Sequence, residues 1–527
     1  MTDIVLTADK TLMTDYNNLS TLGYIGCLPD RLVTNVIKNI IFPKLNYRVA
    51  TYGLRRVEAH LLNNGLDVVI IPPQDINQIK KYKPKIVGVS TVDPLTRKPG
   101  PWTLSTITGG GESVFETEFR LLLEKINILR EKQNFKIIVG GKGACELAIS
   151  DKYSHLYDSI VIGGGSGFVK IFKDVIEGKK IPKKYISNTS ISDHKLSIKK
   201  PSRNGHVQVT IGCPRHCSFC SPGLNNHFSI SKKRILEEVE LNLKNNLKQI
   251  SLVTEDILLY CSNDVYVNQE KVVDLIKSIV KIMKKYNVTT LNMSNVSISA
   301  TIHGKKAVKK ISEIIGTSKE EPIDLVVGVE TGSDRLLKKH MQGKAQPFED
   351  KKWSELVIES LNIQNANYWY PWCSLITGLP DENEEDIIKT LDLIDDLKGN
   401  RLYYFIFHFV PMIDSNLKNE SYASFENISE RRWELFSKCW LHTVREMKKD
   451  MLPSLHLSYS TSTFNKINRK ITFYMIRKIL NGIERELFIY KNNPLGFRKY
   501  YSELNFDETY IFKYFYYRLI EKLKQKN

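Results

Sequence analysis

The chain has 527 residues, of which 42% are hydrophobic and 25% are charged, and its formal net charge is +18 at pH 7. This composition excludes disordered and fibrous chains, and the length is enough for about two to four globular domains. The most apolar stretch, 402–413, contains His408 and Pro411 and is too short to span a membrane, so we expect a buried strand there. The first residues lack a basic segment and a long apolar run, so we expect no signal peptide.

The positive charge has two interpretations that the sequence leaves open. It suits an anionic partner, such as a membrane surface, a nucleic acid or an acidic protein. It is equally typical of a lysine-rich chain whose helices expose solvated faces.

Residues 1–185 alternate short apolar runs with helical patterns. Strands are predicted near 67–72, 85–90, 136–141 and 159–163, and apolar spacing predicts a helix over 115–132. Strands separated by helices in this way indicate a parallel doubly wound sheet of the Rossmann-like kind.

Two glycine-rich turns follow successive predicted strands. One contains Gly140 and Gly141, and the other contains Gly163, Gly164 and Gly165. Glycine permits close approach of the backbone to a ligand, and ligands of such sheets bind beyond the carboxyl ends of the strands. The alternative is that each glycine only makes a sharp turn.

A Ser-, Asn-, Lys- and Pro-rich segment at 186–204 is predicted to be a linker. Beyond it, residues 205–412 alternate strand-like runs near 206–211, 249–256, 289–295, 323–330 and 372–380 with helical segments such as 231–247. The acidic run 381–386 suits the N-terminus of a helix.

Three cysteines lie close together in the sequence, in a C-x3-C-x2-C arrangement formed by Cys213, Cys217 and Cys220. Three thiolates on one loop can hold three irons of a 4Fe–4S cluster, which leaves the fourth iron open to a small molecule. A zinc site would want four ligands, often as two paired cysteine units, and no second pair is present in the sequence. A disulfide framework is typical of short secreted chains, and the scattered remaining cysteines favour a reducing cytoplasm.

The cysteine segment resembles the signature of the radical S-adenosylmethionine (SAM) superfamily. The resemblance implies that 205–412 form a partial βα barrel, and that the cofactors are a 4Fe–4S cluster and SAM. It also implies an external electron donor for the cluster. The sequence identifies no residue that transfers hydrogen.

The same resemblance assigns SAM-binding roles to strand-end residues. It places Glu255 and Asp256 near the SAM ammonium, Ser294 or Asn295 near its carboxylate or ribose, and Glu330 near the ribose or the amino end. Ile376 and Gly378 would flank the adenine, and Phe219 would pack on it or shield the cluster. The alternative for the acidic residues is surface charge or helix capping.

Residues 413–527 are predicted to form a mostly helical, aromatic and basic region. Over 451–527 the chain holds 14 Lys and Arg against 6 Asp and Glu, together with 16 Phe and Tyr. Helical spacing from Phe473 to Tyr490 favours a helix that packs on the barrel. Aromatic and basic side chains together also suit a membrane interface or a single-stranded nucleic acid.

The N-terminal region resembles the cobalamin-binding domain that precedes many radical SAM modules, so cobalamin is a candidate third cofactor. The sequence departs from that family in two respects. The D-x-H-x-x-G segment with the cobalt-ligating histidine is absent, and Gly163-Gly-Gly-Ser-Gly stands where an acidic G-E-G-E turn is common.

Over residues 5–412 the chain resembles an archaeal group of radical SAM proteins, and within it the tetraether-lipid ring synthases. The segments that carry this resemblance are 8–13, 52–59, 88–95, 255–260, 330–336, 341–344 and 391–397. It implies C–C bond formation that makes cyclopentane rings in archaeal tetraether (GDGT) membrane lipids, by an enzyme that associates peripherally with the inner face of the membrane and does not act on nucleic acid. Two alternatives stay open, a cobalamin-dependent C-methyltransferase and a non-enzymatic iron–sulfur protein in RNA binding or regulation.

Overall fold

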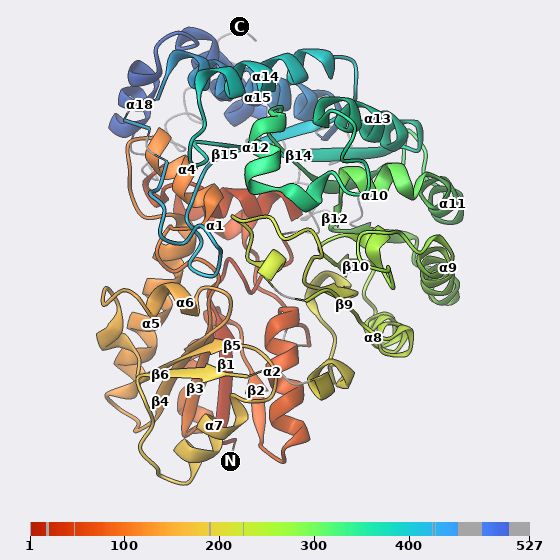
Figure 1. Ribbon diagram of the computed structural model, residues 1–527. Coiled ribbons are helices and arrows are strands. Elements are labelled where there is room, and N and C mark those ends of the chain that lie inside the picture. The colour runs from red at the N-terminus through yellow and green to blue at the C-terminus, as the bar shows by residue number, and fades with distance from the viewer. Residues whose placement is uncertain are drawn as a thin grey trace, which may run out of the picture. The chain divides into compact units, whose positions relative to one another are not determined.

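The computed structural model describes residues 2–16, 20–46, 48–188, 191–224, 226–423, 425–426, 428–451 and 477–504 (Figure 1). The chain divides into two compact units. The first comprises residues 1–190 together with 495–527, and the second comprises residues 191–494.

The first unit contains a six-stranded parallel sheet with the order β2-β1-β3-β4-β5-β6. The strands are β1 (Ile4–Ala8), β2 (Val68–Ile70), β3 (Ile86–Ser90), β4 (Lys136–Gly140), β5 (Ser159–Gly163) and β6 (Lys184–Ser187). The order 2-1-3-4-5 is that of doubly wound sheets, which bind ligands beyond the carboxyl ends of the strands.

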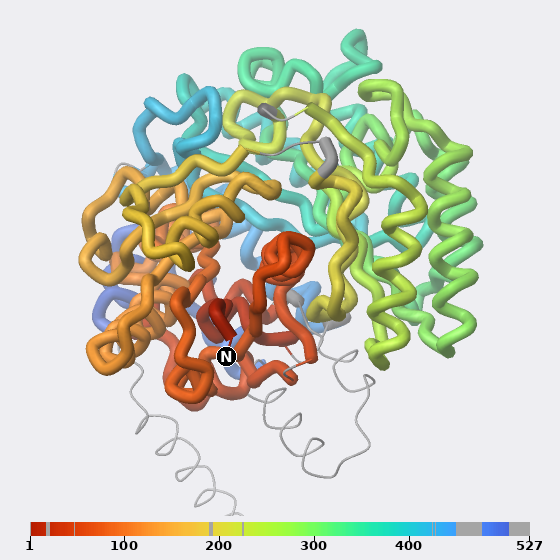
Figure 2. Tube along the Cα trace, turned by 90° about the horizontal axis from the view of Figure 1, so that it is seen from below, coloured from red at the N-terminus to blue at the C-terminus, as the bar shows by residue number. Residues whose placement is uncertain are grey.

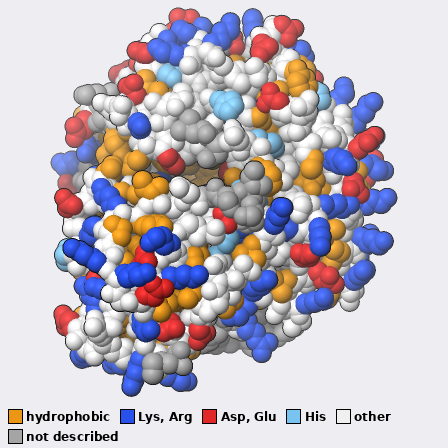
Figure 3. Space-filling view, turned by 60° about the horizontal axis from the view of Figure 1, so that its bottom comes forward, with side chains coloured by type: hydrophobic (Ala, Val, Ile, Leu, Met, Phe, Trp, Pro, Cys, Tyr) orange, Lys and Arg blue, Asp and Glu red, His pale blue; other side chains and the backbone are white. Residues whose placement is uncertain are grey.

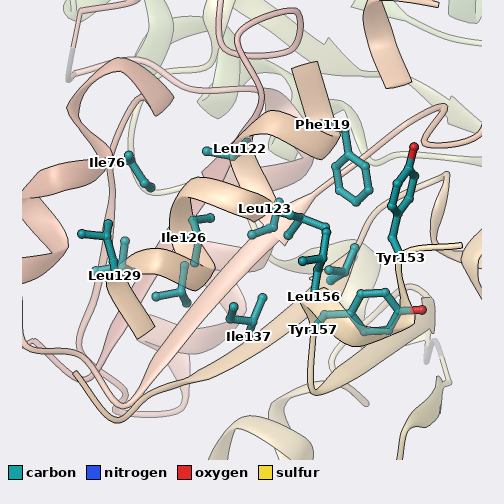
Figure 4. Packing of buried hydrophobic residues seen from close by; sticks show 14 of the residues in the cluster. Ile76, Phe119, Leu122, Leu123, Ile126, Leu129, Ile137, Tyr153, Leu156 and Tyr157 are labelled. Carbon is teal, nitrogen blue, oxygen red and sulfur yellow. The ribbon is translucent and has the colours of Figure 1, made fainter. Parts of the chain in front are cut away.

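Both faces of this sheet are buried. Alternate residues of each strand point to opposite sides of the sheet, so each face packs into its own core. Val5, Val87 and Val139 face one core, which contains the apolar side of α5 (Val114–Arg130). In Figure 4 Phe119, Leu122, Leu123, Ile126 and Leu129 line up along that helix, near Ile137 and the two tyrosines Tyr153 and Tyr157.

The opposite face of the sheet carries Ile4, Leu6 and Ile86 and packs on α2 (Tyr52–Asn63) and α7 (Val169–Ile176). The unit also contains α1 (Asn35–Ile41), α3 (Ile79–Tyr82), α4 (Pro99–Ile107), α6 (Ala144–Leu147) and, from the end of the described chain, α18 (Pro494–Glu503). Arg31 ties α18 to this unit through hydrogen bonds to the carbonyls of Tyr501 and Leu504.

The second unit is a partial barrel of parallel strands. Its strands are β7 (His206–Gln208), β10 (Gln249–Val253), β11 (Thr290–Met293), β12 (Asn295–Val296), β13 (Ile323–Glu330), β14 (Trp369–Thr377) and β15 (Tyr403–His408). They form two sets, β11-β10-β7 and β12-β13-β14-β15. Ser294 joins the sets, because its N–H donates to the carbonyl of Leu252 and its carbonyl accepts from the N–H of Val326.

Helices cover the outside of these strands. In Figures 1 and 2, α8 (Lys232–Lys244), α9 (Gln269–Lys285) and α11 (Lys305–Ile315) lie side by side along one edge of the unit. The others are α10 (Ile298–His303), α12 (Asp334–His340), α13 (Trp353–Ala366), α14 (Glu384–Asp396) and α15 (Glu430–Glu446). A short antiparallel pair, β8 (Thr210–Ile211) and β9 (Phe228–Ser229), frames the cysteine segment.

The predicted fold class is confirmed: an α/β chain with a doubly wound sheet, a partial barrel and helices after it. In the structure, boundaries between elements or units fall inside the predicted segments 186–204 and 413–527. β6 occupies the first residues of 186–204, and the units separate at 190/191. Among the described residues of 413–527, those up to 494 group with the barrel, and 495–504 group with the first unit.

The predicted helix from Phe473 to Tyr490 is described from residue 477 and is helical over 477–489. The aromatic run 510–517 lies outside the described residues. Among the helices that are described, none is long and apolar enough to cross a bilayer.

The surface charge is spread over the face shown in Figure 3. Lys and Arg side chains are scattered among Asp and Glu across this face. This pattern matches solvated helix faces, and any use of the net charge of +18 as a recognition surface stays a prediction.

Candidate functional site

The three motif cysteines lie on one loop that connects β8 to β9, at the carboxyl end of the barrel strands. The thiols of Cys213, Cys217 and Cys220 lie close enough to influence one another electrostatically. Burial raises the pKa of Cys213 to about 11 and that of Cys220 to about 12, and it also raises the pKa of Cys217. These thiols therefore stay protonated until a metal binds and displaces the proton.

The residues of the loop fit an iron–sulfur cluster. Among the described residues no three His, Cys, Asp or Glu side chains are placed to hold one metal ion. A cluster asks for less convergence, because each thiolate binds a different iron. Backbone N–H groups already point at sulfur: that of Arg215 bonds to Cys213, and that of Gly223 bonds to Cys220. Such donors stabilise thiolates, so the loop is prepared for the charge of a bound cluster.

Distant segments hold this cysteine loop in place. The N–H of Ser218 donates to the carbonyl of His340 at 2.8 Å, and the N–H of Asn416 donates to the carbonyl of Ser218 at 3.0 Å. Arg215 Nη1 donates to the carbonyls of residues 343, 344 and 346. Packing is tight here, because a Cβ on Gly343 would lie 2.4 Å from the carbonyl oxygen of Arg215.

Four of the predicted SAM-binding residues follow β10 and β11 in the chain, and the last of them, Asn295, begins β12. Ser294 and Asn295 both donate side-chain hydrogen bonds to the carbonyl of Thr254, at 2.7 and 2.8 Å. Asp256 is buried, accepts from the N–H of Leu258, and accepts from the hydroxyl of Ser297. Burial raises the pKa of Asp256. These three side chains therefore fix the strand ends, whereas Glu255 is exposed and acts electrostatically on Cys220.

Glu330 ends β13 in a left-handed backbone conformation, with φ = +68°, which is unusual for a residue other than glycine. Its carboxylate pairs with Lys344 at 2.6 Å, and both side chains are buried. Ser374 on β14 donates to the same carboxylate at 3.1 Å. Both charges also act on Cys217, so this ion pair lies beside the cysteine loop.

Sequence reasoning did not identify Lys344, Ser374 or Arg215 as site residues. The available signal was position: Lys344 ends the segment 341–344 that carries the family resemblance, and Arg215 lies inside the cysteine motif.

The remaining predicted barrel residues lie near the loop or on β14. Phe219 is half-buried and lies between Cys217 and Cys220 in the sequence. Ile376 is half-buried and shares a strand face with Ser374. Gly378 has φ = +80°, and its N–H donates to Glu382 at 2.6 Å, so glycine is required there by the turn itself.

One inner surface of the barrel is aromatic. We call Trp372, Tyr403, Phe405 and Phe407 the aromatic wall. The ring of Trp372 stacks on Tyr403 and Phe405, with centroids 4.3 and 4.4 Å apart. The opposite face of β15 packs on α15 through Tyr404, so the wall faces inward. Because Trp372 and Ser374 lie on the same face of β14, the wall leads to the buried Glu330–Lys344 pair.

In the first unit the predicted glycines lie at the carboxyl ends of β4 and β5, as expected. A Cβ on Gly141 would lie 2.5 Å from the carbonyl oxygen of Thr91, and one on Gly163 would lie 2.3 Å from that of Ser187. The chain's own backbone therefore accounts for these two glycines. A Cβ on Gly140 would make only an ordinary contact, at 3.9 Å from the carbonyl of Val161, and Gly165 has φ = +73°. Gly164 accepts a hydrogen bond from Ser187.

Comparisons with known proteins connect this geometry to a protein superfamily. Residues 207–394 match the radical SAM superfamily. A tRNA-2-methylthio-N(6)-dimethylallyladenosine synthase of Natranaerobius thermophilus is 22% identical over 307 residues, which are 56% of this chain and 64% of that protein. An uncharacterised protein of Methanocaldococcus jannaschii is 23% identical over 70% of this chain and 76% of its own length.

Among solved structures, the radical SAM methyltransferase TsrM from Kitasatospora setae aligns over 79% of this chain and 77% of its own, with a TM-score of 0.51 and 12% identity. That alignment shows a shared fold. The chain spans less than two thirds of the length of the Natranaerobius thermophilus protein, so the activity of that protein is not assigned to this chain. The cysteine loop, the parallel strand ends around it and the matched residues together show that this chain carries a radical SAM domain, whose family uses a 4Fe–4S cluster and S-adenosylmethionine.

Proposed function

We propose that the protein is a cobalamin-dependent radical SAM methyltransferase that methylates an unactivated carbon of an apolar substrate. The observation that carries the proposal is the two-part architecture. A doubly wound unit precedes a radical SAM barrel, and the same arrangement occurs in a radical SAM methyltransferase solved with cobalamin and a 4Fe–4S cluster bound.

The barrel residues have separate tasks in this proposal. Cys213, Cys217 and Cys220 would hold the cluster, and the Glu330–Lys344 pair would meet the opposite charges of the SAM amino acid group. The aromatic wall would hold an apolar substrate and exclude water. When bound, the cluster and SAM supply a 5′-deoxyadenosyl radical, and cobalamin supplies a methyl group.

The doubly wound sheet supports a corrinoid site beyond the carboxyl ends of its strands, where such folds bind ligands. Gly140, Gly164 and Gly165 are the residues of the predicted set that remain available for that role. Gly141 and Gly163 are needed for backbone packing whether or not a ligand binds.

A second candidate is ring formation in tetraether membrane lipids, which the family resemblance favours. The aromatic wall suits an isoprenoid chain as well as any other apolar substrate. The two reactions differ in their balance of atoms: methylation adds one CH2 to the substrate, whereas ring closure removes two hydrogens.

The test is an anaerobic incubation of the reconstituted protein with a reductant, methyl-deuterated SAM and archaeal tetraether lipids, followed by mass spectrometry. Methyl transfer predicts deuterium in the product together with S-adenosylhomocysteine, and purified protein that takes up a corrinoid. Loss of two hydrogens with 5′-deoxyadenosine alone would replace the first candidate by the second. The Cys217→Ala variant is the control, and turnover by it would contradict both.

A further inference from the structure

Arg215 is a buried cation without a counter-ion in the cysteine loop. Only 3% of its surface is exposed, and it lies between Cys213 and Cys217 in the sequence. Its Nη1 donates to backbone carbonyls of residues 343, 344 and 346 at 3.0 to 3.3 Å. Its Nε and Nη2 are buried and find no hydrogen-bond partner among the described residues.

The charge of Arg215 is not cancelled within the described part of the chain. No carboxylate there lies within ion-pair distance of its guanidinium, although Asp256 is near enough to feel its charge. The neighbouring buried cation, Lys344, differs because Glu330 pairs with it at 2.6 Å. A buried charge with two unused donors is costly, and such a group normally has an anionic partner.

Two sulfurs of the loop, those of Cys213 and Cys217, are near enough to feel this charge, and both become anionic when they bind iron. The backbone N–H of Arg215 bonds to the sulfur of Cys213, and the side-chain charge opposes the rise that burial causes in the pKa of both Cys213 and Cys217. Three thiolates make a bound cluster anionic, and reduction adds one more negative charge. Positive charge and N–H donors near the sulfurs both favour the reduced state of a cluster.

We propose that Arg215 raises the reduction potential of the cluster, because its buried positive charge has no ion-pair partner among the described residues, acts on two of the cysteine ligands and keeps Nε and Nη2 without a hydrogen-bond partner. The inference rests on the proposed cluster and deepens it, because it names the residue that makes reduction by an external donor easier.

The first test measures the reduction potential of the reconstituted cluster without SAM, by titration monitored with electron paramagnetic resonance. We expect Arg215→Gln to lower the equilibrium constant for one-electron reduction at least tenfold, which is 59 mV. Arg215→Lys should fall between the two, because it keeps the charge and loses the forked donors. Arg234→Gln removes an equally buried guanidinium, one that pairs with Glu238 on α8, and should leave the potential unchanged.

An unchanged potential in Arg215→Gln at full iron and sulfide content would overturn the proposal, and so would a shift of equal size in Arg234→Gln. A weaker affinity for SAM at an unchanged potential would assign Arg215 to the SAM carboxylate instead, which also overturns it.

A second test needs no variant, in case the substitutions prevent cluster loading. Wild-type protein labelled with 15N only in the guanidino nitrogens of arginine should show an arginine nitrogen coupled to the reduced cluster in electron spin echo envelope modulation. Absence of that coupling in fully loaded protein would contradict the proposal. Neither test depends on turnover, so a failure of the methyltransferase assignment would appear separately, as a lack of SAM cleavage.

Discussion

The ion pair between Glu330 and Lys344 joins two buried side chains at the carboxyl end of β13. Removing one partner leaves the other charged and buried, which typically costs about 3–5 kcal/mol. We therefore expect Glu330→Gln to lower the free energy of unfolding by that order, measured by denaturant titration, and to weaken SAM binding to the cluster-loaded protein.

The double variant Glu330→Gln/Lys344→Met separates stability from binding. It removes both charges, so most of the lost stability should return, while the affinity for SAM should stay low because neither charged group is left to meet the ligand. Full recovery of SAM affinity in the double variant would show that the pair is only structural.

A second prediction at the residue scale concerns Asp9, which follows β1 in the first unit. Burial raises its pKa from 3.8 to about 6, although Thr11 and Leu12 donate hydrogen bonds to it. Because the folded state holds the proton more tightly than the unfolded state, stability should fall as the pH rises from 4 to 6 and then level off. Over that window the loss is of the order of 3 kcal/mol.

Asp9→Asn cannot ionise, so it should lack this part of the pH dependence and be more stable than the wild type above pH 6. The quantity to compare is the difference in unfolding free energy between the two proteins across pH 4–7, because every other titratable group is the same in both. A difference that does not change with pH would disprove the assignment.

At the scale of elements, the contact between the cysteine loop and residues 343–346 is tested by Gly343→Ala. The added Cβ would lie 2.4 Å from the backbone oxygen of Arg215, and backbone cannot yield as a flexible side chain does. We expect about 1–3 kcal/mol of destabilisation and a lower iron content per chain after reconstitution.

The matched control is Gly482→Ala. Gly482 lies inside the helical segment 477–489, and a Cβ there would meet nothing within 4 Å. This variant should load iron normally and be more stable by up to about 1 kcal/mol. Equal losses of iron in the two variants would remove the contact with Arg215 as the cause.

Apolar periodicity is a good guide to the buried central elements and a poor one to the edges. It predicts β2, β3, β4, β5 and α5, whose apolar residues contribute to the two cores of the first unit. In the first unit, two strands lie outside the predicted ones. β6 is an edge strand with one buried residue among four, and β1 is a run of only five residues, too short for periodicity to stand out.

The candidate site shows a similar limit. Asp256 and Ser294 follow β10 and β11, and Asn295 begins β12, while their assigned roles toward SAM stay predictions. Their hydrogen bonds to Thr254, Leu258 and Ser297 depend on strand register, which no local pattern reveals. Lys344 and Arg215 escaped prediction for the same reason. Their partners lie 14 to 131 residues away along the chain and meet them only in the fold.

At the scale of the whole molecule, the net charge of +18 predicts binding to anionic membranes. In co-sedimentation, vesicles containing anionic lipid should retain the protein at low salt and release it as the ionic strength rises. Neutral vesicles of the same size are the control. Equal binding to both kinds would point to the aromatic side chains as the membrane-binding groups. Binding to neither kind would contradict membrane association, and the substrate would then have to reach the protein after extraction from the membrane.

The long-range anchoring of the cysteine loop has a consequence for how the protein is made. Ser221 on the loop bonds to Asp414, which is 193 residues further along the chain. At about 5–20 residues per second, a ribosome needs roughly 10–40 s to reach that point after the cysteines emerge. During that time the nascent thiols have no folded pocket, so cluster insertion should follow release of the barrel, and slow translation should increase oxidised, cluster-free protein.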